Sequence, residues 1–103
     1  MNFQVKITEY AKNDLKIAYE FYDFQKTGLG KYFLDIILSE IELLEVYGCL
    51  HQKIFGYHRM LSKKFPFGIY YECDKKEKII YIIAILDLRK NPKSIEKYLQ
   101  KRK

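Results

Sequence analysis

The stretch YHRMLSKKFPFGIYYECDKKEKIIYIIAILDLRKNP, residues 57–92, decides the fold because it holds three strand patterns joined by charged turns. Side chains alternate in character over residues 67–73, which indicates a strand with one buried face. Residues 79–86 are apolar at every position, which predicts a strand covered on both faces near the middle of a sheet. Pro66 belongs to the turn between two of these strands, since proline cannot donate to a central ladder.

Upstream of this stretch, the sequence predicts one strand and two helices. Residues 3–7 alternate with the period of a half-buried strand, and the Thr8 hydroxyl can cap the helix that follows. Two glycines within residues 27–30 interrupt the helical pattern, and a second helix is expected from about residue 31 to Tyr47. The short link between these apolar-faced helices predicts an antiparallel helical hairpin.

Downstream of the strands, Asn91 and Pro92 have the pattern of an N-cap and a first helical residue, which predicts a short C-terminal helix. The expected order is therefore strand, two helices, three strands and helix. Segregated strands joined by hairpins favour an α+β fold, in which a small antiparallel sheet carries the helices on one face. A single domain over residues 1–103 accounts for the whole length.

Composition excludes several classes of protein. An apolar content of 49% is too high for a disordered chain. The longest nearly uncharged apolar run is far shorter than a membrane span, and the first residues show no leader pattern, so a soluble cytoplasmic protein is expected. Cys49 and Cys73 are expected to be two ordinary thiols in a reducing cytosol. No residues have metal-ligand spacing, and we expect neither a metal nor a cofactor.

Charge is unevenly distributed along the chain. Residues 1–50 carry five Lys and eight acidic residues, a net charge of −3, whereas residues 51–103 carry fourteen Lys or Arg and five acidic residues, a net charge of +9. This asymmetry favours nucleic acid or an acidic protein as the partner. A solvated Lys-rich surface is the alternative, above all for the tail at residues 101–103.

Three segments in succession, ITEYAKNDLKIAYEFY, RMLSKKFPFGIYYEC and IIYIIAILDLRKNP, resemble the RelE/ParE toxin superfamily over essentially the whole chain. The resemblance implies a small cytoplasmic toxin of a bacterial type II toxin–antitoxin system, which inhibits growth, serves plasmid stabilisation and is neutralised by a co-encoded antitoxin. Toxins of the RelE branch bind the ribosome and cut mRNA, and those of the ParE branch inhibit DNA gyrase. A homodimer and a toxin–antitoxin heterotetramer both stay open.

The choice of branch depends on a few positions. RNA cleavage needs a group that accepts a proton, cations that stabilise the phosphorane and a group that protonates the leaving oxygen. Arg89 falls at the strand-end arginine of RelE-type nucleases. His58 and Met60, however, fall where that type has two lysines, and Gly68 falls where it has an arginine. The sequence is therefore closer to ParE, and gyrase inhibition is the expected activity.

Two alternatives stay open, and with them the question of whether the chain is an enzyme. The first is a ribosome-dependent mRNA endoribonuclease of RelE type, with His58 and Arg89 as its catalytic residues. The second is an inactive toxin-fold protein that acts only by binding a partner.

We also expect an acidic antitoxin segment to lie across the sheet. Its contacts would be basic residues, with apolar residues flanking them: Arg59, Lys63, Lys64 and Arg89, with Tyr57, Phe65 and Phe67. Each basic residue also has a plainer interpretation. Lys63 and Lys64 fit a solvated turn, and Arg89 could merely pair with Asp87.

Overall fold

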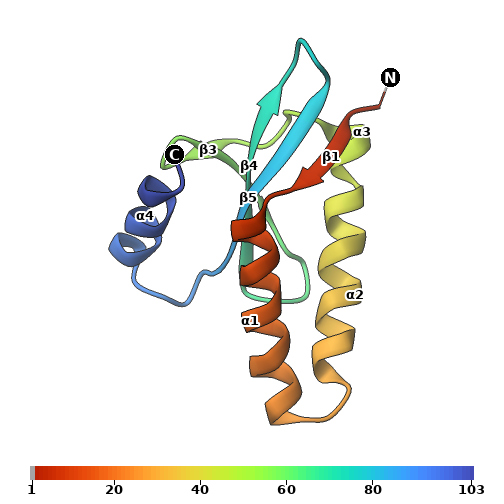
Figure 1. The fold of residues 1–103 in the computed structure, drawn as a ribbon, viewed down its shortest axis with the longest axis vertical. Helices are drawn as coiled ribbons and strands as arrows, with labels where there is room; N and C mark the ends of the chain where they lie inside the picture. Colours follow the sequence, from red (N-terminus) through yellow and green to blue (C-terminus); the bar gives the residue numbers. More distant parts are fainter. Residues whose placement is uncertain (1) are drawn as a thin grey trace.

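The structure, a computed structural model that describes residues 2–103, is built around a twisted sheet with a helical hairpin packed against it (Figure 1). The α+β class and the expected order of the main elements are confirmed, with two short additions, α3 and β2. In chain order the elements are β1 (Gln4–Ile7), α1 (Glu9–Gln25), α2 (Leu29–Glu42), α3 (Leu44–Tyr47), β2 (Lys53–Ile54), β3 (Tyr57–Leu61), β4 (Phe67–Asp74), β5 (Ile79–Asp87) and α4 (Pro92–Lys101).

Helix ends lie where the sequence places cap residues. The Thr8 hydroxyl oxygen accepts the Ala11 N–H at 3.3 Å and donates to the Ile82 carbonyl at 2.7 Å, so it caps α1 and joins it to β5. Asn91 caps α4 by accepting the Lys93 N–H at 2.8 Å, and Pro92 follows at the first helical position. Gly48 ends α3 with a φ of +60°, a conformation that glycine adopts without strain.

The sheet has the strand order β1-β5-β4-β3-β2, and one strand departs from the expectation. Strands β2 to β5 are antiparallel neighbours, but β1 pairs parallel to β5, so the sheet is mixed. No hairpin joins β1 to β5, and therefore no turn imposes an antiparallel pairing. Instead α1 begins directly after β1 and runs on over the second half of β5, where Asp14 accepts the Ile85 N–H. This course requires β1 and β5 to point the same way.

Helices cover both faces of the sheet, whereas the sequence predicted one. The first core lies between the sheet and the α1–α2 hairpin, and it contains Phe33, Ile37, Ile69, Tyr71 and Ile82. The second core lies under α4, and it contains Tyr57, Tyr70, Ala84, Ile95 and Leu99. The strand expected to be covered on both faces is β5, and that prediction is confirmed for its central residues.

A bulge in β5 supplies the second core with an extra apolar residue. The register of β4 and β5 shifts between Tyr70 and Tyr71, so that Tyr70 pairs with Ala84 and Tyr71 pairs with Ile82. Ile83 is the extra residue. As a result Ile83 and Ala84, which are adjacent in the chain, both contribute to the core under α4.

The crossing of α1 and α2 depends on Gly30. A Cβ atom there would lie 2.6 Å from the Tyr19 carbonyl oxygen and 2.8 Å from the Asp23 Cβ. We expect Gly30→Ala to lower the free energy of unfolding by about 1–3 kcal/mol, because the backbone of α1 must move to admit the methyl group. Urea denaturation followed by circular dichroism measures this change. Lys31→Ala, on the exposed side of the same turn, is the control, and equal stability of the two variants would contradict the close approach.

Candidate functional site

Arg59 is one of the expected partner-binding cations that take part in no ion pair among residues 2–103. It lies on the α4 side of the sheet, opposite Tyr70, and its Cδ is 3.2 Å from the point where a Gly68 Cβ would stand. The missing side chain of Gly68 therefore gives the Arg59 stem a place to lie.

Arg89 is held by its neighbour. Its Nε and Nη2 donate to the Asp87 carboxylate at 3.0 and 2.7 Å, and its backbone N–H donates at 2.9 Å. Hydrogen bonds from Arg89 hold the pKa of Asp87 below its ordinary value, so the carboxylate stays charged and offsets the guanidinium. Asp87 pairs with Phe67, a residue of the first core, so Arg89 and Arg59 lie toward opposite faces of the sheet.

His58 is held by the loop that precedes β2. Its Nδ1 lies 2.5 Å from the His51 carbonyl oxygen and must donate to it, because a carbonyl only accepts. Its ring stacks on Tyr71, with 5.1 Å between the ring centroids. His58 pairs with Tyr71 on β4, whereas Arg89 follows the partner of Phe67 on that strand. Four residues of strand span about 13 Å, so the structure separates the two expected catalytic residues.

Two further positions of the nuclease pattern, where RelE-type nucleases have basic residues, are occupied here by the uncharged residues Met60 and Gly68. Met60 is 6% exposed and belongs to the first core. Gly68 is covered by Arg59 and Leu88. These two positions therefore place no cation near His58.

Three residues expected to be apolar contacts for a partner are committed to the protein's own cores. Tyr57 is 2% exposed, and its hydroxyl donates to the Leu99 carbonyl at 3.4 Å. Phe67 is buried in the first core, and Phe65 packs its half-buried ring 4.9 Å from that of Phe33. These side chains stabilise the fold, and we do not assign them to a partner surface.

Lys63 and Lys64 lie in the exposed turn between β3 and β4, as expected. The turn is fixed to α2 by one carboxylate, because Glu40 accepts the Lys63 N–H at 2.8 Å and the Ser62 hydroxyl at 2.7 Å. Both ammonium groups are absent from the ion pairs found among residues 2–103. They remain available to an anion.

A groove of about 720 Å³ lies between the α2–α3 segment and β3, and sequence reasoning missed it. We call it the β3 groove. Its apolar lining is Leu43, Tyr47, Leu50, Ile54, Met60 and Leu61, and Arg59 and Lys63 supply its positive charge. Leu50 is 72% exposed and Leu61 is 52% exposed, so the groove presents contiguous apolar surface to solvent. The available signal was the set of apolar residues Leu43, Val46, Tyr47 and Leu50 around the end of the predicted second helix.

The cysteines also differ from the expectation. Cys49 and Cys73 are joined as a disulfide, with their Cα atoms 5.7 Å apart, so the prediction of two free thiols is wrong for this structure. The hydrogen bond from the Tyr71 hydroxyl to the Gly48 carbonyl at 2.9 Å joins the same two segments, because it holds the chain after α3 against β4. The bridge therefore fixes one wall of the β3 groove to the sheet.

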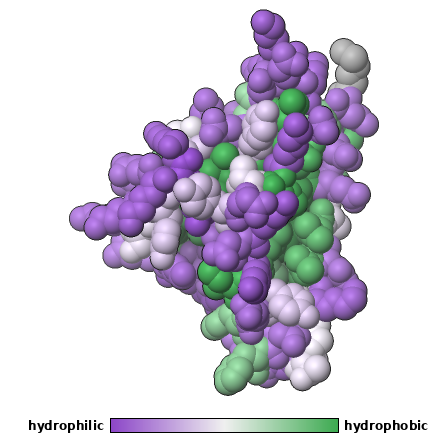
Figure 2. Space-filling model, viewed as in Figure 1, coloured by the Kyte–Doolittle hydropathy of each residue, from purple (hydrophilic) through white to green (hydrophobic). Residues whose placement is uncertain are grey.

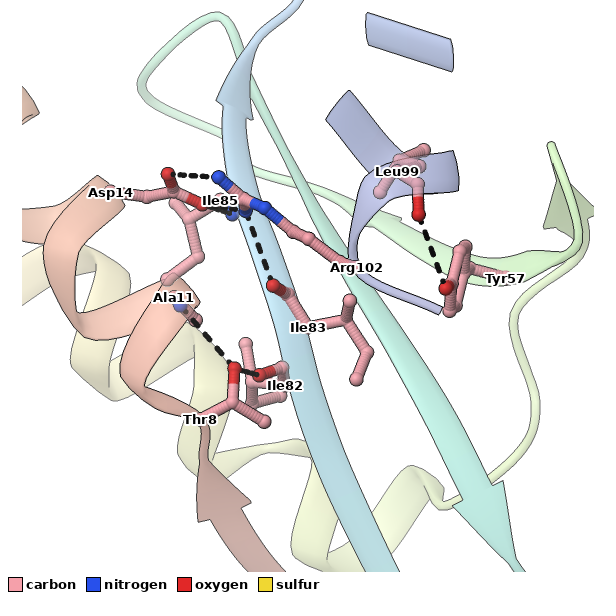
Figure 3. Close-up of polar contacts among 9 residues, drawn as sticks. All are labelled: Thr8, Ala11, Asp14, Tyr57, Ile82, Ile83, Ile85, Leu99 and Arg102. Atoms are coloured by element: carbon pink, nitrogen blue, oxygen red, sulfur yellow. Dashed lines mark hydrogen bonds and ion pairs between the residues drawn. The ribbon is translucent and has the colours of Figure 1, made fainter. Parts of the chain in front are cut away.

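The basic tail contains a residue whose side chain is largely covered by the protein. The Arg102 side chain reaches from the end of α4 across β5 to α1, where Nη1 and Nη2 donate to the Asp14 carboxylate at 2.5 and 2.9 Å (Figure 3). Arg102 also donates to the carbonyl of the bulged Ile83 at 3.3 Å. Its side chain is 10% exposed and that of Asp14 is 7% exposed. Arg102 thus joins three elements and is not part of the solvated basic surface.

The surface that remains is mixed. Figure 2 shows hydrophilic residues over α4 and at the tip of the β4–β5 hairpin, and hydrophobic residues in the region between β1 and α2. Within residues 2–103, no helix combines the length and the apolar character that crossing a membrane requires. The same residues contain no cluster of three or more His, Cys, Asp or Glu side chains that could hold a metal ion.

Comparison with known proteins identifies the fold. No protein-family model matches the sequence, and no curated protein matches it significantly. Among solved structures, a chain described as the chromosomal ParDE TA system from P. aeruginosa superposes with a TM-score of 0.72 at 19% sequence identity. The match covers 84% of this chain and 96% of that chain. The fold that the sequence resemblance implied is therefore confirmed: this chain has the α+β fold of a ParDE component.

Proposed function

We propose that this chain is the toxin of a bacterial toxin–antitoxin pair, that it acts in the cytoplasm and that a co-encoded antitoxin neutralises it. The observation that carries the proposal is the fold shared with a chain of a ParDE system over 84% of this chain's length. The basic half of the sequence, with a net charge of +9 over residues 51–103, supports an acidic protein or nucleic acid as the partner.

The target we propose is DNA gyrase, which the toxin would inhibit by binding. The separation of His58 from Arg89, and the pairing of Arg89 with Asp87, favour this target over mRNA cleavage. A nuclease stabilises developing negative charge with cations that are free to meet it. Here the guanidinium already has a carboxylate partner, so it would have to exchange that partner for phosphate.

We expect induction of the chain alone in a bacterium to arrest growth, and co-expression of the neighbouring gene to restore it. Filamentation and DNA damage should appear while protein synthesis continues. Colony counts, microscopy and pulse-labelling with a radioactive amino acid measure these effects. The reason is that blocked gyrase leaves broken DNA, whereas mRNA cleavage stops translation first.

The control is an Arg102→Ala variant, whose fold we expect to be strongly destabilised. Because growth arrest should require the folded chain, this variant should arrest growth less than the natural sequence does. Normal growth at verified soluble expression of the natural sequence would refute the toxin proposal. Rapid loss of translation, with mRNA 5′ ends in phase with codons, would refute gyrase as the target and favour the endoribonuclease.

A further inference from the structure

The second half of strand β3 has a free outer edge, because β2 pairs only with its first two residues. Ser62 donates its N–H to the Phe67 carbonyl at 2.9 Å, and bonded pairs alternate along an antiparallel ladder, so Met60 and His58 face β4. Arg59 and Leu61 then direct their backbone groups away from β4. Arg59 donates its N–H to the Gln52 carbonyl at 3.0 Å, but β2 extends only over Lys53–Ile54. Among the bonds of the described residues, the Arg59 carbonyl and both backbone groups of Leu61 have no partner on this outer side.

The β3 groove lies beside this edge, so a strand placed there would meet two different environments. Side chains alternate between the two faces of a strand. Those directed toward α2 and α3 would contact the apolar wall formed by Leu43, Tyr47 and Leu50. Those directed toward the other face would contact Arg59, and one end of the strand would lie near Lys63. The groove is therefore matched to a segment in which apolar and acidic residues alternate.

We propose that the β3 groove binds an extended acidic–apolar peptide segment of a partner protein, which adds to the sheet as a sixth strand beside Arg59 and Leu61. Backbone hydrogen bonds to the edge contribute to the affinity, and the pockets for alternate side chains supply the specificity. That this partner is the antitoxin rests on the proposed function above. The mode of binding rests on the free edge and the groove alone.

Charge selects this occupant over a second copy of the chain. A second copy has the same net charge of +6 and the same cations at the groove, so self-association at this surface is opposed by repulsion. An acidic segment meets Arg59 and Lys63 without an internal carboxylate to displace, since neither takes part in the ion pairs found among residues 2–103. Glu40, the acid that lines the groove, is already bonded to the turn.

The test uses a synthetic peptide of alternating sequence, acetyl-ELEVELE-amide, titrated into the full chain by calorimetry and by NMR. We expect saturable binding, and slower hydrogen exchange of the Leu61 amide in the complex. Leu50→Asp and Lys63→Glu should each weaken binding about tenfold or more. Val46→Asp is the matched control for Leu50→Asp, because Val46 is 70% exposed and lies outside the groove lining.

Two N-methylated peptides test the strand pairing itself. In one peptide the amides of the apolar residues are methylated, and in the other the amides of the acidic residues. Amides that share a side-chain face also share an edge, so only one of the two peptides can still pair with β3. We expect one peptide to lose at least about tenfold in affinity while the other binds as before.

Several results would overturn the proposal. Equal affinities of the two methylated peptides, an unchanged Leu61 amide, or binding to acetyl-KLKVKLK-amide as tight as to the acidic peptide would each exclude strand addition by an acidic segment. These outcomes are independent of growth arrest. A chain that arrests growth but does not bind the peptide keeps the proposed function and loses the docking mode, and the reverse result does the opposite.

Discussion

Replacing Arg102 by alanine will lower the free energy of unfolding by about 3–5 kcal/mol, the cost of leaving a buried charge without its partner. The carboxylate of Asp14 would lose two charge-assisted hydrogen bonds in a site where its side chain is 7% exposed. The bulged Ile83 carbonyl would lose its donor as well. Since a domain of this size is stable by only about 5–15 kcal/mol, the variant should lose a large part of its total stability. Urea denaturation followed by circular dichroism measures the change.

A double-mutant cycle separates the ion pair from the packing. We expect Asp14→Asn to cost less than Arg102→Ala, because an amide oxygen can still accept the Ile85 N–H that Oδ2 accepts at 3.0 Å. The double variant Asp14→Asn, Arg102→Ala should be less destabilised than the sum of the two single changes. Arg89→Ala is the matched control, since it breaks a bidentate pair of similar geometry whose arginine side chain is 57% exposed. Equal destabilisation by Arg102→Ala and Arg89→Ala would refute the structural role of the buried pair.

The sequence contains a signal for this pair, although the distribution of net charge does not reveal it. Ala11, Asp14, Leu15 and Ala18 recur at the spacing of one helix face, and that face is buried. An acid among apolar residues on such a face indicates a buried partner. The partner, however, is 88 residues away in the chain, and no periodicity could have selected Arg102 from the three basic residues of the tail.

Strands, helix caps and the order of elements followed from local patterns, because alternation, cap residues and glycines act over a few positions. The direction of β1 could not be predicted from local patterns. No turn joins β1 to its neighbour β5, so its direction depends on where α1 packs. At the candidate site, the local alternation of a strand was again sufficient to assign faces. His58 and Arg59 were correctly expected on opposite faces of one strand, and their positions in the structure agree with that alternation.

What the sequence could not show is which side chains the fold uses for itself. Tyr57 and Phe67 looked like anchors for a partner because basic residues flank them, but both are buried in the protein's own cores. The groove was missed for the opposite reason. Its apolar wall comes from α2, α3 and the following loop, and its edge comes from β3, so it exists only once these segments are packed together.

Reducing the disulfide between Cys49 and Cys73 will lower the free energy of unfolding by about 3.5 kcal/mol. The two residues are 24 positions apart, and the expected loss is the loop entropy that a bridge of this span removes from the unfolded chain. Urea denaturation with and without reductant measures the difference. A Cys49→Ser, Cys73→Ser double variant is the control, because its stability should not respond to reductant.

Thiol titration completes the test of the bridge. Protein purified without reductant should show no thiol that reacts in urea until reductant is added, whereas two reactive thiols would exclude the bridge. Comparing oxidised with reduced protein also tests the β3 groove, because Leu50 and His51 follow Cys49 directly and line the groove. Without the bridge, that wall is still held by the hydrogen bond that the Tyr71 hydroxyl donates to the Gly48 carbonyl at 2.9 Å. We therefore expect reduction to weaken binding of the acidic peptide by less than Leu50→Asp does, since it loosens the wall without removing the apolar contact.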